Sequence, residues 1–121
     1  MHSDTVVPSV ASSEVLLVLT TWPDSVGAQA IAQSLVAQQL AACVQVLGVA
    51  SSVYRWQGVV ETAQEVPLLI KTTRAQYPVL EETLQAQHPY AVPEIIALGV
   101  SEGLPAYLQW VVAETAVGDR K

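Results

Sequence analysis

The chain has 121 residues, the length of one domain, of which 51% are hydrophobic and only 13% are charged. Its net charge is −6, and its five Lys and Arg residues form no cluster, which argues against nucleic-acid binding and against anionic membrane surfaces. The apolar runs fall well short of the roughly 20 residues that a transmembrane helix needs. Because so little charge is available to cover a small domain, the composition predicts a large buried interface between copies of the chain.

The single cysteine, Cys43, excludes an intrachain disulfide and a zinc-type cysteine cluster. Residues 1–13 lack the basic start and continuous apolar core of a signal peptide, so we expect a cytoplasmic protein. We interpret residues 1–13 and 118–121 as tails that flank one domain, residues 14–117.

The first half of the domain is predicted as strand, helix and strand. Residues 14–21 form a nearly unbroken apolar run that is typical of a central strand. Asp24 suits the N-cap of a helix over residues 25–39, where apolar residues recur with helical spacing. Residues 43–47 return as a strand, and the small residues 48–52 predict a bend or bulge after it.

A long hairpin over residues 53–73 joins the two halves, with its turn near Gln57-Gly58. Pro67 lies in the second arm and predicts a bulge or an edge position, because proline has no N–H to donate to a ladder. The hairpin supplies one strand to each half. We therefore interpret it as the organiser of the fold and as one wall of the functional site.

The second half begins with another helix. Its start has two candidates: Pro78 in the first turn, or a capping box formed by Thr73 and Gln76. The helix is predicted to end at His88, because the following residue, Pro89, disfavours helical geometry before it.

A strand over residues 94–100 and a last helix, opening at residues 104–106 and ending by Gly118, complete the chain. Two β-α-β units side by side predict an α+β, ferredoxin-like split βαβ fold: one antiparallel sheet with both helices on one face. The other face of the sheet also carries Val, Leu and Ile. Three or more copies that pack these faces inward would cover them.

Ionisable side chains that suit a site are few and scattered. His88 is either a metal ligand or proton-transfer group, or a helix-end residue near free carbonyls, and its isolation favours the second. Cys43 has the surroundings of a core residue. Glu61 and Glu94 are either paired carboxylates for a cation or solvated acids. Lys71 lies in an apolar strand, which predicts either that it sits at the end of the strand or that it pairs with one of these two carboxylates.

Four aromatic residues are predicted as packing anchors or as walls of a ligand cleft: Tyr54, Trp56, Tyr90 and Trp110. The sequence has no glycine-rich phosphate loop and no nucleophile motif, so we expect no enzyme.

Four segments in order resemble the CutA divalent-cation-tolerance family: residues 40–43 (LAAC), 54–58 (YRWQG) with Glu61, 69–72 (LIKT) and 88–94 (HPYAVPE). The resemblance runs from about Val15 to Thr115. It implies a ferredoxin-like subunit in a compact homotrimer, with the hairpin strands running between subunits. It also implies a role in tolerance of copper and other divalent cations, and an architecture similar to that of PII-like signalling proteins.

The copper ligands of some bacterial members are a cysteine at the end of the first strand and two adjacent histidines before Pro-Tyr. The matching positions here are Thr20 and Gln87-His88. Thr and Gln are poor copper ligands. The resemblance therefore implies a weak divalent-metal site, for which His88, Glu61 and Cys43 are the candidate ligands.

Three functions stay open at this point. The first is weak binding of copper or another divalent cation, without an organic cofactor. The second is a PII-like module that binds a small anion with Lys71 as charge partner, and the third is a stable interaction scaffold. The predicted cleft between subunits comprises Tyr54, Trp56, Glu61, Lys71, His88, Tyr90, Glu94 and Trp110.

Overall fold

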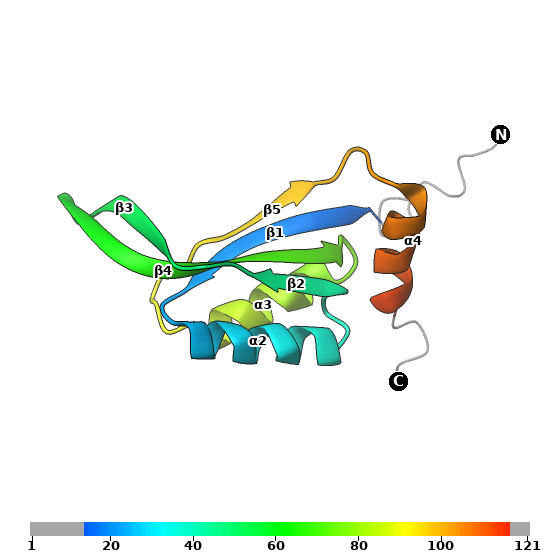
Figure 1. Cartoon of the computed structure of the whole chain (residues 1–121), viewed down its shortest axis with the longest axis horizontal. Helices are drawn as coiled ribbons and strands as arrows, with labels where there is room; N and C mark the ends of the chain where they lie inside the picture. Colours follow the sequence, from blue (N-terminus) through cyan, green and yellow to red (C-terminus); the bar gives the residue numbers. More distant parts are fainter. Residues whose placement is uncertain (1–13, 117–121) are drawn as a thin grey trace.

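Five strands and three helices alternate in residues 14–116, the part of the chain that the computed structural model describes (Figure 1). The predicted tails, residues 1–13 and 118–121, lie outside the described residues, as does residue 117. The predicted α+β class is confirmed, because one antiparallel sheet combines with helices along a single chain.

The sheet has the order β2-β4-β1-β5, and all its neighbouring strands run antiparallel. Strand β1 (Val15–Trp22) lies between β4 (Val59–Thr73) and β5 (Ile95–Gly99), and β2 (Cys43–Val46) pairs with the other edge of β4. A central strand needs apolar residues on both faces, which explains the unbroken apolar run of β1.

Helices α2 (Ser25–Ala37) and α3 (Tyr77–Gln87) cover the same face of the sheet, as predicted (Figure 1). Asp24 caps α2, because its Oδ1 accepts a 2.6 Å hydrogen bond from the backbone N–H of Gly27. The fully buried core between sheet and helices includes Val18, Leu35, Leu68, Ile70, Leu80 and Leu84.

Pro78 lies in the first turn of α3, which settles the start of this helix in favour of the proline. The capping-box alternative is wrong: the Gln76 side-chain amide donates instead to the backbone oxygen of Thr115, at 2.8 Å. Gln76 thus links the start of α3 to the end of the last helix.

Helix α4 (Pro105–Glu114) packs at the end of the sheet, where Val111 forms a small buried cluster with Val15 and Ala42. Val111 is the only fully buried residue of this helix, whereas Leu104, which precedes the helix, is 71% exposed. The helix ends before Thr115, and the stop predicted at Gly118 lies outside the described residues.

The hairpin of β3 (Ala50–Trp56) and β4 extends beyond the sheet (Figure 1). Its turn is the predicted Gln57-Gly58 pair, with φ values of 52° and 84°, typical of a two-residue hairpin turn.

Pro67 was expected at a bulge or an edge, yet β4 continues through it without a break. The ladder breaks in the partner strands instead: pairing with β3 ends at Glu65, and pairing with β2 begins at Leu68. The Pro67 oxygen accepts a 2.9 Å hydrogen bond from the N–H of Leu47, which lies in the segment that connects β2 and β3. The N–H and C=O groups of one strand residue point to the same side, so the N–H that Pro67 lacks would also face that segment. Proline therefore removes no bond from the ladder with β1.

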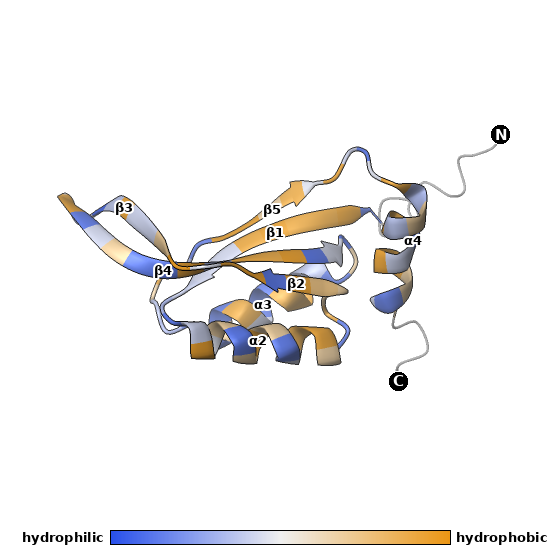
Figure 2. Cartoon of the chain, viewed as in Figure 1, coloured by the Kyte–Doolittle hydropathy of each residue, from blue (hydrophilic) through white to orange (hydrophobic). Residues whose placement is uncertain are grey.

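The face of the sheet that points away from α2 and α3 carries apolar, only partly buried side chains, as expected. Figure 2 shows that most of β1 is hydrophobic. We call this face of the sheet the open face, defined by Leu17, Leu19, Leu69, Ile96 and Leu98, which the strand register places side by side. Ile96 is 50% exposed and Leu98 is 51% exposed.

None of the helices within residues 14–116 is long and apolar enough to cross a membrane.

Candidate functional site

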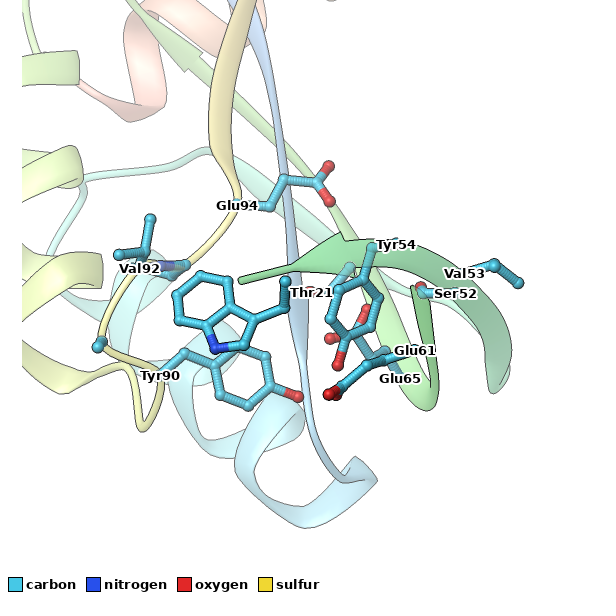
Figure 3. Close-up of a pocket in the computed structure, with 12 residues that line it drawn as sticks. Thr21, Ser52, Val53, Tyr54, Glu61, Glu65, Tyr90, Val92 and Glu94 are labelled. Atoms are coloured by element: carbon cyan, nitrogen blue, oxygen red, sulfur yellow. The ribbon is translucent and has the colours of Figure 1, made fainter. Parts of the chain in front are cut away.

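A cavity of about 790 Å³ lies at the base of the hairpin, where the hairpin, the end of β1 and the loop before β5 meet (Figure 3). Strand pairing with β4 brings the hairpin to the end of β1, and the loop after α3 closes the remaining side. The lining residues are Thr21, Ser52, Val53, Tyr54, Trp56, Glu61, Glu65, Tyr90, Ala91, Val92, Pro93 and Glu94.

The cavity is acidic, because three glutamates line it and no basic side chain of residues 14–116 does. Glu61 and Glu65 lie four residues apart on β4, so the two-residue period of a strand places them on the same face. Figure 3 shows the hydroxyls of Tyr54 and Tyr90 pointing toward these two carboxylates, while the carboxylate of Glu94 points away from them.

Glu65 is the most buried of the three acids, at 9% exposure. Within residues 14–116 the structure shows one ion pair, Arg74 with Glu14 at 2.9 Å, so no basic side chain of that part pairs with Glu65. Buried carboxylates are rare unless a partner compensates their charge. A carboxylate without such a partner makes the cavity attractive to a cation.

Tyr90 provides the hydroxyl partner of Glu65. The pKa of Tyr90 is raised above its ordinary value, first by burial and then by the hydrogen bond to Glu65 and the negative charge of that carboxylate. Tyr90 therefore stays protonated at neutral pH, and its hydroxyl is the donor of that hydrogen bond. One neutral hydrogen bond leaves the negative charge of Glu65 in place.

His88 lies behind the cavity wall and holds Tyr90 in place. Its buried ring accepts from the backbone N–H of Tyr90 through Nδ1 at 3.0 Å. The proton is therefore on Nε2, which donates to the backbone oxygen of Thr21 at 2.7 Å. The ring also contacts Trp22, at a centroid distance of 4.3 Å, and Tyr90, at 4.9 Å.

Because both ring nitrogens of His88 are used, the structure leaves neither free for a metal. His88 takes the other role that the sequence allowed, that of a helix-end residue: its backbone N–H also donates to the Leu84 oxygen at 2.9 Å.

Cys43 and Lys71 face each other across β2 and β4, far from the cavity. The Lys71 Nζ lies 2.8 Å from the Gln45 Oε1 and 4.0 Å from the Cys43 Sγ. Ten residues of extended strand, about 33 Å, separate Lys71 from Glu61. Within one chain Lys71 pairs with neither Glu61 nor Glu94, and it takes the other option that the sequence allows, a position near the end of its strand. One chain also cannot place Cys43 and Glu61 on the same metal.

The copper ligand set described for some family members does not assemble either. The Thr20 side chain is 1% exposed and belongs to the β1 residues that face the helices, and its hydroxyl finds no hydrogen-bond partner among residues 14–116. In the described part of the chain, no group of three His, Cys, Asp or Glu side chains is close enough to hold a metal. A metal site built from residues 14–116 of one chain therefore has at most two such ligands.

The predicted cleft is thus partly assembled. Tyr54, Trp56, Glu61, Tyr90 and Glu94 line the cavity. Lys71, His88 and Trp110 do not, and Trp110 contacts Tyr107 on α4, at the end of the sheet away from the hairpin (Figure 1).

Sequence reasoning missed Glu65 and Thr21. The signal for Glu65 was present in the even spacing from Glu61 along one strand, which places both acids on one face. Thr21 joins the cavity only because the Thr21 and Pro67 positions are opposite each other in the register.

Comparison with known proteins gives a consistent family. A family model described as CutA1 divalent ion tolerance protein matches residues 16–114. The divalent-cation tolerance protein CutA of Thermus thermophilus is 48% identical over 99 residues, which is 82% of this chain and 96% of that protein.

Solved structures agree in fold. The crystal structure of CutA from Xylella fastidiosa is 48% identical, with a TM-score of 0.82, over 85% of this chain and 99% of that one. The CutA1 structure from Shewanella sp. SIB1 is 40% identical, with a TM-score of 0.83, over 86% and 97% of the two chains.

Proposed function

Because this chain belongs to the CutA1 divalent ion tolerance family, we propose that it acts in divalent-cation tolerance by binding cations weakly in the acidic cavity at the base of the hairpin. One observation carries the proposal: Glu65 is buried in the cavity wall, and no basic side chain of residues 14–116 compensates its charge.

The donors of the cavity decide which cations suit it. Glu61 and Glu65 would hold the ion, with carboxylate oxygens that favour hard or borderline divalent cations. Copper binds more tightly to thiolate and imidazole, and here Cys43 is distant and both His88 nitrogens are used. We therefore expect weak copper binding, which still exceeds the binding of Mn²⁺ because Cu²⁺ ranks above Mn²⁺ in affinity for a given set of ligands.

Titration of Mn²⁺ and Cu²⁺ into three forms of the full chain tests this proposal. The double substitution Glu61→Gln with Glu65→Gln should weaken binding at least tenfold. Glu82→Gln with Glu102→Gln is the matched control, since both side chains are exposed and the net charge changes equally. Equal affinity in all three forms would overturn the proposal.

We also propose that the subunit is ferredoxin-like and that three copies assemble around their open faces and hairpins. The strand order β2-β4-β1-β5, with α2 and α3 on one face, supports the first part. The second part is supported by half-exposed apolar side chains on the open face, and by Val53 and Val60 on the hairpin, at 68% and 65% exposure.

Sedimentation equilibrium tests the assembly. The wild-type chain should sediment with the mass of three chains, and Leu98→Glu on the open face should dissociate it. Val26→Glu is the control, because Val26 is 81% exposed on α2, which covers the opposite face of the sheet. A stable wild-type monomer would refute the trimer.

A further inference from the structure

We propose that the cavity binds a primary alkylammonium ion, an inference that rests on the cation-binding role given above. The volume is the first reason. About 790 Å³ is far more than one metal ion occupies, because even a water molecule takes only about 30 Å³ in the liquid. The volume instead lies within the range of roughly 300–1,000 Å³ that is typical of sites for small organic molecules.

The arrangement of acceptors favours a primary ammonium group. Such a group carries three N–H donors and no acceptor. Glu65 and Glu61 supply several acceptor oxygens on one face of β4, and the hydroxyls of Tyr54 and Tyr90 point toward the same place (Figure 3). An ammonium ion would also supply the positive charge that Glu65 lacks.

The remaining walls favour an alkyl chain attached to that group. Val92 and Pro93 line the cavity with apolar carbon, and Trp56 adds an aromatic surface. Aromatic rings attract ammonium groups through their electron-rich faces, and apolar walls gain free energy by removing an alkyl stem from water. A hydrated metal ion would gain nothing from these walls.

The aromatic wall is held in place before any ligand arrives. Tyr90 is fixed through its backbone N–H to His88, and the two rings contact each other at 4.9 Å. A wall that is already ordered reduces the entropy that binding costs. The ordered wall therefore favours binding of a specific ligand over a loosely held counter-ion.

Calorimetric titration of the full chain with n-butylammonium chloride, at constant ionic strength, tests the inference. We expect saturable binding, at least tenfold weaker binding of tetramethylammonium, which has no N–H donor, and no binding of n-butanol, which has no charge. Glu65→Gln should weaken butylammonium binding at least tenfold. Glu82→Gln, exposed on α3, should leave it unchanged. Circular dichroism checks that each variant is folded.

Competition with Mn²⁺ in the wild-type chain separates this inference from the proposed function, and it needs no variant. Displacement of Mn²⁺ by butylammonium supports both. Binding of Mn²⁺ with no binding of butylammonium overturns the alkylammonium inference and leaves the metal proposal standing. Binding of butylammonium without Mn²⁺ does the reverse. Equal affinity for butylammonium and tetramethylammonium contradicts the role given to the carboxylate acceptors.

Discussion

Strand β4 passes through two different environments. One segment packs in the core and stabilises the fold, whereas the other forms the hairpin and faces outward. From Val66 to Thr73 the strand lies inside the sheet, where Leu68 and Ile70 are fully buried. From Val59 to Gln64 it forms one arm of the hairpin and remains almost entirely exposed.

Both segments contain apolar residues, so composition alone does not distinguish them. The inner segment gains its stability from the core that it shares with α2 and α3. The outer segment buries little in its own chain, so its apolar side chains are available to a ligand or to another copy. Glu65 lies at the boundary between the two segments. It is as buried as the residues of the inner segment, although its side chain is an acid like Glu61 in the outer segment.

The largest expected effect is a loss of core packing in the inner segment. Leu68→Ala should lower the free energy of unfolding by about 2–5 kcal/mol, because it removes a fully buried side chain and leaves a cavity. Urea unfolding at several protein concentrations measures it. Val60→Ala is the outer counterpart at 65% exposure, and its cost should appear only through assembly, hence vary with protein concentration. Equal, concentration-independent losses would remove the contrast.

The next effect concerns the link between the core and the cavity. His88→Phe keeps an aromatic ring but removes two hydrogen bonds, so it should cost about 1–3 kcal/mol of stability. It should also weaken Mn²⁺ binding severalfold, because Tyr90 loses its anchor. Gln87→Ala, at the exposed neighbouring position, is the control and should change stability by less than about 0.5 kcal/mol. Loss of copper binding at unchanged stability would make His88 a ligand instead.

A smaller effect compares two buried threonines of the inner region. The Thr20 hydroxyl has no hydrogen-bond partner among residues 14–116, so Thr20→Val should raise the free energy of unfolding by about 1 kcal/mol. The Thr72 hydroxyl donates to the Leu40 oxygen at 2.7 Å, so Thr72→Val should lower it by about 1–2 kcal/mol. Thermal unfolding of both variants gives the two signs. A loss of stability in both would show that Thr20 has a partner after all.

The smallest effect is a pH dependence at the cavity wall. The pKa of Tyr90 is raised by burial and by Glu65, so the contribution of Tyr90 to stability is complete below the ordinary tyrosine value of about 10. That contribution disappears as the pH rises through the higher pKa of the folded state. Tyr90→Phe should flatten this part of the stability curve above pH 10. An identical curve for wild type and variant would contradict the raised pKa of Tyr90.

Much of the fold could be predicted from the sequence, because local patterns determine it. The apolar run of β1, the cap at Asp24 and the turn at Gln57-Gly58 are each specified by adjacent residues. Pro67 was predicted less well, since a proline signals a missing donor but not which neighbour that donor would face.

The cavity depended on information that no local pattern contains. Tyr54 and Glu61 were predicted from their residue types and from their place in the hairpin, and the register places them opposite each other. Lys71 lies outside the cavity of one chain, because the length of β4 carries it far from the hairpin turn. Glu65 shares the cavity with residues 90–94, a tertiary arrangement that the strand period does not show.

The most direct test of the central claim, that this chain holds cations through the carboxylates of β4, is anomalous diffraction from crystals grown with Mn²⁺. We expect a manganese peak within coordination distance of Glu61 and Glu65. A peak at His88 or Cys43, with none in the cavity, would contradict it.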